Sequence, residues 1–245
     1  MNNYDAITLR AALPDWVPEC RYLAQTDSTN REAMEWALKG ARHGSLVVAG
    51  FQTDGRGRLG REWRAPAGSG LLFSIVLRPP TPPDSWPLLT LAAGVAVCEC
   101  LAGLGFKPEL KWPNDVLLSG RKVAGILAEM AGGVVILGIG VNTGRVEFPE
   151  DLIASATSLE MVSGRSLDHL EVLSGLIGQL AREVDVPAEA VVDRYRKWSA
   201  TLGKSVRVDL GSGPVEDRAV DIDRTGGLML AGGQVVRAGD VLQLR

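Results

Sequence analysis

Cysteine and histidine are scarce in this chain of 245 residues, which has three cysteines (Cys20, Cys98 and Cys100) and two histidines (His43 and His169). Three cysteines do not make a disulfide framework, and the pair at 98 and 100 lies in an apolar stretch where buried, inert thiols are common. The two histidines lack the spacing of metal ligands, so we expect surface or capping groups. The sequence therefore predicts neither a disulfide-stapled protein nor a protein-held metal site.

A basic excess is also missing. The 26 lysines and arginines are outnumbered by 29 acidic residues, which gives a formal net charge of −3. Proteins dedicated to nucleic-acid binding normally carry a basic domain or stripe, so we expect no nucleic-acid partner. Only six of the basic residues are lysines, and a lysine in a distinctive stretch is therefore more informative than usual.

Uncharged runs are short. Ser85–Cys98, for example, has 14 residues, whereas a bilayer span needs roughly 18–20. The segment Met1–Asp5 lacks the basic and apolar regions that begin a secretory signal. These features predict a cytoplasmic protein without a membrane partner.

Periodicity and turn signals predict an α+β fold with a mixed, largely antiparallel sheet backed by helices, because neighbouring strands follow one another without regular helical crossovers. Thr29 and Glu32 have the spacing of a capping box, and Gly40 suits the end of the same helix. We expect helices at 26–40, 86–105, 167–184 and 187–200. We expect strands at 45–51 and 71–77 and a meander at 109–112, 116–118, 122–130 and 134–141.

Composition changes after Leu202–Gly203, where short strands joined by glycine-rich turns predict a small β-barrel-like module. We therefore divide the chain into a main domain, 1–200, and a C-terminal β domain, 201–245. A module of this size buries little surface by itself, so we expect it to pack against the main body.

The segment between the first two predicted strands is rich in glycine and arginine, and its centre is Gly55–Arg61 (GRGRLGR). Three guanidiniums on so flexible a backbone would repel one another without an anion. Each can donate two parallel hydrogen bonds to a phosphate or carboxylate, so we predict an anion-binding loop. The spacing and lysine of a P-loop are absent. The alternative is an exposed linker with an incidental basic bias.

A second distinctive stretch is Lys111–Asp115 (KWPND), which a short turn separates from Lys122 at the start of an apolar strand. An ammonium at the edge of a partly desolvated pocket interacts more strongly than it would in water. We expect Gly125 to leave room for a flat ligand and Asp115 to pair with a neighbouring cation, while Asn114 supplies both donors and acceptors. The alternative is a hairpin turn with two surface basic residues.

No nucleophile, base and orienting group stand together in the sequence, and the glycines of Gly138–Asn142 (GIGVN) do not open a helix as a dinucleotide fingerprint requires. The candidate site thus consists of positioning groups and charge. This fits phosphoryl or nucleotidyl chemistry, in which catalysis neutralises and aligns anionic groups.

Taken together, these stretches resemble the biotin–protein ligases, or biotin–[acetyl-CoA-carboxylase] ligases. The resemblance runs from about Arg21 to Arg245 and implies a class II synthetase-like catalytic domain with a small SH3-like β-barrel. Only some 20 residues precede it, so we expect a short form without the N-terminal DNA-binding domain of some bacterial members. The matching stretches, in family order, are Asp27–Asn30, Gln52 with Gly55–Arg61, Lys111–Asp115, Arg121–Leu127 and Gly138–Asn142.

The resemblance implies a two-step reaction with ATP, Mg²⁺ and biotin: formation of biotinyl-5′-AMP, then transfer of biotin to a lysine of a biotin carboxyl carrier domain. Exposed sheet edges leave a homodimer open. The implied catalytic residues are Lys122, Arg56 and Arg58. The implied biotin-binding residues are Ser28, Thr29, Asn30, Gln52, Arg56, Gly57, Arg58, Lys122 and Gly125. The implied ATP- or adenylate-binding residues are Arg58, Arg61, Trp63, Lys111, Asn114, Asp115, Lys122 and Asn142.

Two rival functions stay open. A lipoate–protein ligase shares the fold and the adenylation logic, but its Arg-Arg-x-x-Gly-Gly-type signature is not found in this sequence. A non-catalytic biotin-binding protein is the other rival, although a mere binder would not require the triphosphate-directed cations Arg56, Arg58 and Lys122.

Overall fold

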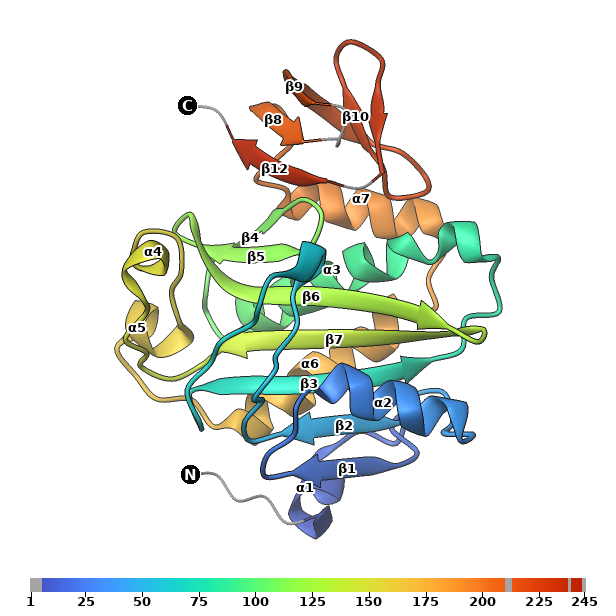
Figure 1. Ribbon diagram of the computed structural model, residues 1–245, viewed down its shortest axis with the longest axis vertical. Helices are drawn as coiled ribbons and strands as arrows, with labels where there is room; N and C mark the ends of the chain where they lie inside the picture. Colours follow the sequence, from blue (N-terminus) through green and yellow to red (C-terminus); the bar gives the residue numbers. More distant parts are fainter. Residues whose placement is uncertain (1–5, 210–212, 238, 244–245) are drawn as a thin grey trace.

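The computed structural model describes residues 6–209, 213–237 and 239–243. Its main body is a seven-stranded sheet in the order β1-β2-β3-β7-β6-β5-β4, and a five-stranded sheet follows in the order β11-β10-β9-β8-β12 (Figure 1). The strands of the main sheet are β1 (Cys20–Leu23), β2 (Leu46–Ala49), β3 (Gly70–Leu77), β4 (Pro108–Lys111), β5 (Asp115–Leu118), β6 (Arg121–Ala131) and β7 (Val134–Asn142). The helices are α1 (Ala6–Ala12), α2 (Thr29–Leu38), α3 (Pro87–Gly103), α4 (Glu150–Ile153), α5 (Leu159–Ser163), α6 (His169–Glu183) and α7 (Ala188–Trp198).

Within the main sheet, β1 and β2 are parallel, and the other neighbouring strands are antiparallel. The predicted fold class, a mixed and largely antiparallel sheet backed by helices, is confirmed. The register places Gly125 of β6 opposite Gly140 of β7, and it places Gly138 between Leu127 of β6 and Ser74 of β3. Because alternate residues of a strand share a face, these positions form one surface of the sheet.

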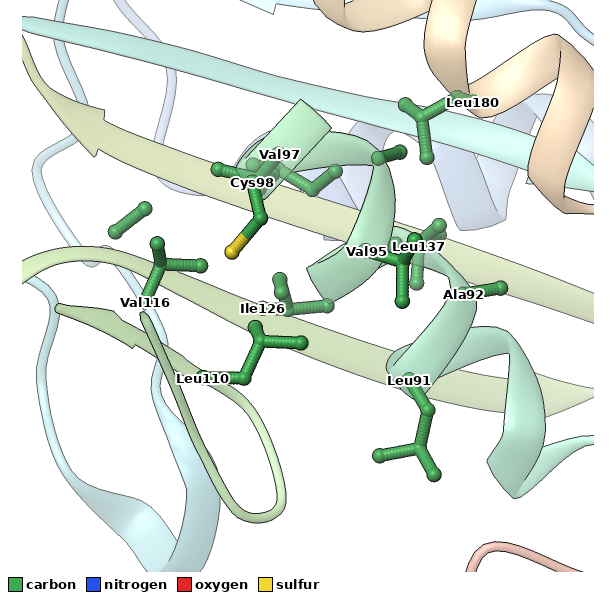
Figure 2. Packing of buried hydrophobic residues seen from close by; sticks show 14 of the residues in the cluster. Leu91, Ala92, Val95, Val97, Cys98, Leu110, Val116, Ile126, Leu137 and Leu180 are labelled. Carbon is green, nitrogen blue, oxygen red and sulfur yellow. The ribbon is translucent and has the colours of Figure 1, made fainter. Parts of the chain in front are cut away.

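The opposite surface is covered by α3, α6 and α7 and forms the main core. Figure 2 shows Leu91 and Cys98 of α3 among Leu110, Val116 and Ile126 of the strands, all of them buried. A smaller apolar cluster joins α2 to β2, β3 and β7 on the first surface, with Trp36, Val47 and Ile136 among its members. The sheet is therefore packed along its whole length on one side, whereas α2 covers only part of the other.

The segment Pro83–Gly103, which includes α3, is long and apolar enough to cross a membrane by length and composition. However, 72% of its most apolar stretch is buried inside the protein. A core helix of a folded domain meets the same criteria, and α3 packs against β4, β5 and β6 as such a helix does.

Several local predictions were incomplete or wrong. Periodicity missed α1, β1 and the short helices α4 and α5. The predicted capping box is wrong: Ser28 is the N-cap of α2, and the carboxylate of Glu32 accepts a hydrogen bond from Thr26. His169 is also not a surface group, since it is buried and lies 2.7 Å from the Thr143 hydroxyl. The helix end was predicted correctly, because Gly40 adopts a positive φ of 97° just beyond the C-cap.

The C-terminal module consists of antiparallel strands and packs on the main body, as expected. The Trp112 indole donates a hydrogen bond to the carbonyl of Gly226 at 3.0 Å, and the buried residues Val206 and Val208 belong to the main core cluster. Its strands are β8 (Ser205–Asp209), β9 (Pro214–Ile222), β10 (Leu228–Leu230), β11 (Val235–Val236) and β12 (Asp240–Gln243).

Candidate functional site

A cavity of about 570 Å³ opens on the surface of the sheet that α2 leaves uncovered. Its lining comes from the start of α2, the glycine–arginine loop, the β4–β5 turn, β6, β7, the region of α4 and Val241 of the C-terminal module. The structure brings all the sequence-predicted site residues together here: Ser28, Thr29, Asn30, Gln52, Arg56, Gly57, Arg58, Arg61, Trp63, Lys111, Asn114, Asp115, Lys122, Gly125 and Asn142.

Glycines form the floor of this cavity. The indole of Trp63 lies against Gly125 and Gly140, so closely that a Cβ added to Gly140 would stand 2.5 Å from Trp63 Cε2. The space that we expected Gly125 to leave for a ligand therefore holds the Trp63 ring and the end of the Lys122 side chain. The Trp63 Nε1 is buried and has no hydrogen-bond partner among the described residues. A buried donor of this kind favours a ligand acceptor nearby.

The first turn of α2 forms one wall. A Cβ added to Gly138 would lie 2.1 Å from Asn30 Oδ1, so only glycine allows the helix to approach β7 this closely. The first N–H groups of a helix have no acceptor within the helix and need one from elsewhere. At Thr29 the acceptor is not a local side chain but Gln52 Oε1, 2.7 Å away. This contact joins the helix to the beginning of the glycine–arginine loop.

Two side chains that the sequence analysis missed complete this wall. The hydroxyl of the fully buried Ser74 lies 2.7 Å from Thr29 Oγ1 and 2.6 Å from Asn30 Oδ1. The Asn30 amide in turn donates to Glu129 Oε2 at 2.7 Å. A serine and a glutamate inside apolar strands carry no motif of their own. The alternation of inward-facing positions on β3 and β6 is the only sequence signal for them.

Two cations of the site, Arg56 and Lys122, are paired with protein carboxylates. Arg56 Nη1 lies 2.9 Å from Glu129 Oε1, and Lys122 Nζ lies 2.6 Å from Asp115 Oδ1 and 5.5 Å from the Trp63 ring centre. The predicted pairing of Asp115 is confirmed. We expected the arginines of the loop to need an anion, and for Arg56 the structure shows the Glu129 carboxylate of β6 in that place. Binding of a ligand anion by the loop stays a prediction.

Arg58 connects the loop to two other parts of the molecule. Its Nη1 lies 3.4 Å from Asn114 Oδ1 and 3.4 Å from the carbonyl of Gly239 in the C-terminal module. Asn114 is held against β6, where its Nδ2 donates to the carbonyl of Ile126 at 2.8 Å. On the far side, Asn142 Nδ2 donates to the carbonyl of Thr157 at 3.0 Å. The contacts of Arg58 and Asn114 hold the cavity wall on the side of the β4–β5 turn.

The thiols do not supply a nucleophile. Burial raises the pKa of the Cys100 thiol to about 11 and raises the pKa of Cys98 further, so both remain protonated at neutral pH. The prediction of inert core thiols is confirmed for this pair, while Cys20 is partly exposed. Within the described part of the chain, no group of three or more His, Cys, Asp or Glu side chains is arranged to hold a metal ion.

The model of the biotin/lipoate A/B protein ligase family matches residues 22–144. The biotin–[acetyl-CoA-carboxylase] ligase of Mycobacterium tuberculosis is 41% identical, with 91% of this chain and 88% of that protein aligned. The ligase of the same name from Paracoccus denitrificans is 36% identical over 89% of this chain and 98% of its own length. The structure of biotin protein ligase from Aquifex aeolicus in complex with biotin and ATP superposes with a TM-score of 0.81 at 30% identity, covering 93% of this chain and 99% of that one.

Proposed function

The chain belongs to the biotin/lipoate A/B protein ligase family, and from that premise we propose that it is a biotin–[acetyl-CoA-carboxylase] ligase. It activates biotin with ATP and then attaches biotin to a lysine of a biotin carboxyl carrier domain. The observation that carries this proposal is the convergence of Arg56, Arg58 and Lys122 on one cavity with a hydrogen-bonding wall at the start of α2.

In the first step, an oxygen of the biotin carboxylate forms a bond to the α-phosphorus of ATP. The bond from that phosphorus to the bridging oxygen breaks, and its electron pair leaves with pyrophosphate. Both reactants are anionic, so their approach is opposed by charge repulsion. Preorganised cations in a water-poor site offset this repulsion without a proton transfer. We assign this neutralisation of charge to Lys122 and Arg56.

In the second step, the ε-amine of the acceptor lysine attacks the carbonyl carbon of the mixed anhydride. The carbon–oxygen bond to AMP breaks, AMP leaves with the electron pair, and the nitrogen loses a proton to give the amide. The anhydride is sensitive to water, so a covered cavity protects it. Arg58, which reaches both the β4–β5 turn and the C-terminal module, is the residue we assign to retention of the adenylate.

The wall at α2 suits the polar ring of biotin. Ser28, Thr29, Asn30 and Gln52 line it with hydroxyl and amide groups. Neighbours hold these groups in place: Gln52 and Ser74 contact Thr29, and Ser74 and Glu129 contact the Asn30 amide. We assign all four residues to the biotin-binding wall. The adenylate side of the proposed site comprises Arg58, Arg61, Trp63, Lys111, Asn114, Asp115, Lys122 and Asn142.

Mg²⁺ fits this site as a companion of the phosphates. The described lining offers carboxylate oxygens from Asp115 and Glu62, and Mg²⁺ in nucleotide sites is commonly held by one or two carboxylates together with phosphate oxygens. When bound, the ion supplies neutralisation of phosphate charge. We further propose that the protein is cytoplasmic, that its protein partner is a biotin carboxyl carrier domain, and that the domain boundary lies at 200/201. A homodimer is compatible with this proposal.

Biotin-dependent exchange of labelled pyrophosphate into ATP tests the function. We expect exchange with biotin and not with lipoate, followed by labelling of a carrier domain by radioactive biotin. Exchange with lipoate alone would assign the chain to the lipoate ligases of the same family. Biotin binding without any exchange would leave a non-catalytic binder.

A further inference from the structure

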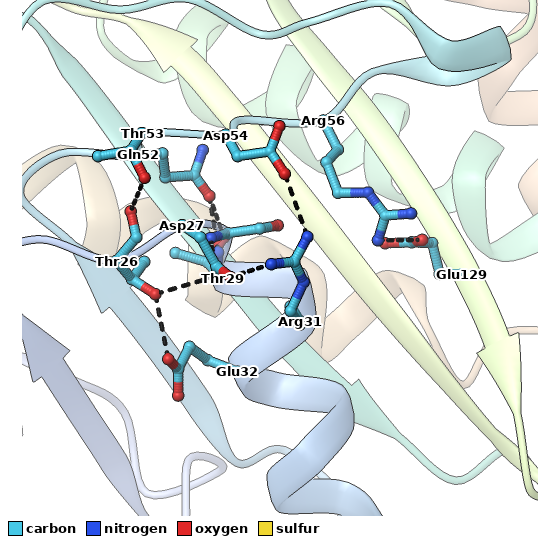
Figure 3. A network of polar contacts seen from close by, with 11 residues as sticks. Thr26, Asp27, Thr29, Arg31, Glu32, Gln52, Thr53, Asp54, Arg56 and Glu129 are labelled. Atoms are coloured by element: carbon cyan, nitrogen blue, oxygen red, sulfur yellow. Dashed lines mark hydrogen bonds and ion pairs between the residues drawn. The ribbon is translucent and has the colours of Figure 1, made fainter.

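Glu129 of β6 contacts two parts of the site that are far apart in sequence, and Figure 3 shows its ion pair with Arg56. Its Oε1 is 2.9 Å from Arg56 Nη1, and its Oε2 accepts a hydrogen bond from Asn30 Nδ2 at 2.7 Å. Arg56 and Asn30 both line the cavity, whereas Glu129 stands behind that lining. The contacts of Glu129 with the site thus run through two residues that do line the cavity.

The orientation of the Asn30 amide is fixed by its partners. The Ser74 hydroxyl donates to Asn30 Oδ1, so the Nδ2 group faces Glu129 and the carbonyl of Leu127, 3.4 Å away. A carboxylate and a carbonyl only accept hydrogen bonds, and the reversed amide would bring acceptors together. Asn30 thus holds the Glu129 carboxylate in a defined position behind the cavity lining.

Both oxygens of Glu129 accept from donors, which makes the carboxylate irreplaceable by its closest isostere. A glutamine has one accepting oxygen and one donating NH₂ group. At this position the NH₂ group would face either Arg56 or Asn30, both of which are donors. Glutamine therefore preserves one of the two links and breaks the other, without leaving a cavity.

Besides the Thr29–Gln52 contact, an exposed ion pair also links the loop to α2. Arg31 of α2 pairs with Asp27 and lies 3.1 Å from Asp54 Oδ2 at the start of the loop, with the Asp54 side chain 60% exposed (Figure 3). Exposed ion pairs contribute little. The arginines of the two pairs are equally exposed, Arg56 at 44% and Arg31 at 45%, but the Glu129 side chain is only 27% exposed. The carboxylate beside the cavity is therefore the less screened of the two.

We propose that Glu129 is a positioning residue for biotin binding, which holds the Arg56 guanidinium beside the α2 wall so that the loop and the ring-binding wall form as one unit. This inference rests on the proposed function. It predicts that the loss of Glu129 affects biotin binding rather than the chemical step, and that the effect runs through Arg56.

The test compares Glu129→Gln with Asp54→Asn, which makes the same carboxylate-to-amide change on the exposed link. We expect Glu129→Gln to raise the KM for biotin about tenfold, the scale of one charge-assisted hydrogen bond, while kcat changes less than threefold. Asp54→Asn is expected to leave the biotin KM within twofold of wild type. Glu129→Asp keeps the charge but shortens the side chain, and it should recover part of the loss.

A double-mutant cycle identifies the route. In an Arg56→Ala background, Glu129→Gln should raise the biotin KM by less than twofold, because its main partner is gone. A full tenfold effect in that background, or a biotin KM within twofold of wild type for Glu129→Gln alone, would overturn the inference. Matching melting temperatures of Glu129→Gln and wild type would separate positioning from loss of fold. A melting point lowered together with kcat would indicate a structural role instead.

Calorimetry with biotin alone, without ATP, separates this inference from the proposed function. Wild-type chain that binds biotin but exchanges no pyrophosphate would contradict the ligase activity, while the dissociation constants of the variants would still decide the role of Glu129. Equal biotin affinity for wild type and Glu129→Gln would contradict the inference alone. A wild-type chain that binds no biotin would overturn both.

Discussion

The two faces of the seven-stranded sheet use the same strands in opposite ways. Against α3, the inward positions of β4 and β6 are large aliphatic side chains such as Leu110 and Ile126. On the other face, the neighbouring positions are Gly125, Gly138 and Gly140. One face contributes stability through close packing. On the other face, glycines leave space for the start of α2 and the Trp63 indole to lie directly against the strand backbone. The division predicts separate effects on stability and on binding.

The largest effect is expected from Lys122→Ala on the cavity face. Removal of one preorganised charge should lower the rate of adenylate formation by about 10²–10³-fold. The melting temperature should hardly change, since the ammonium belongs to the open face. Single-turnover formation of biotinyl-5′-AMP measures the rate, and calorimetry measures biotin affinity. A loss of less than tenfold would remove Lys122 from its assigned role.

Ile126→Ala tests the packed face. Ile126 follows Gly125 on β6, and its side chain points to the opposite face of the sheet. The side chain is 1% exposed, and its truncation should lower the free energy of unfolding by about 2–5 kcal/mol. Urea denaturation followed by circular dichroism measures this loss. At a temperature where the variant is folded, the biotin KM should stay near that of wild type. A binding defect as large as that of Lys122→Ala would show that the two faces are not independent.

A matched pair of glycines sharpens the comparison. In Gly138→Ala the new Cβ would meet Asn30 Oδ1 at 2.1 Å, whereas in Gly94→Ala on α3 it would meet the flexible end of Leu110 at 2.9 Å. We expect Gly138→Ala to weaken biotin binding more than tenfold by displacing the start of α2, a strain on the scale of roughly 1–3 kcal/mol.

Gly94→Ala should leave biotin binding unchanged, because the helix gains propensity and Leu110 can shift. Titration calorimetry on the two variants decides between these expectations. Equal biotin affinities for Gly138→Ala and wild type would mean that the glycine is not needed for the wall.

The smallest effect concerns His169, where α6 of the packed face meets the end of β7. Burial lowers the pKa of this imidazole below its usual value of about 6.5, although the neighbouring Asp168 opposes the shift. Between the folded and unfolded pKa values the unfolded chain binds more protons, so the free energy of unfolding falls as the pH drops below about 6.5. His169→Gln should flatten this dependence of the free energy of unfolding on pH, which urea titrations at several pH values would measure. An unchanged slope would assign it to other groups.

The fold was predictable to the extent that its signals were local. The long apolar run of α3, the amphipathic period of α6 and α7 and the turn signals of the β4–β7 meander identified these elements within a few residues. The missed β1 has only four residues and pairs in parallel with β2. Parallel strands are not joined by a tight turn, so no local turn signal indicates this pairing. The start of α2 was misjudged for a related reason, since the acceptor for Thr29 is Gln52, 23 residues away.

The sequence by itself determined the chemical groups of the site: guanidiniums on a glycine backbone, an ammonium at a strand start and small residues on β6 and β7. These properties belong to single residues and short spacings, so they can be read without a fold. Only the tertiary structure decided which carboxylate meets which cation and which ring lies over which glycine. Such contacts act over a few ångströms between strands and loops distant in sequence, and their register follows from packing of the whole sheet.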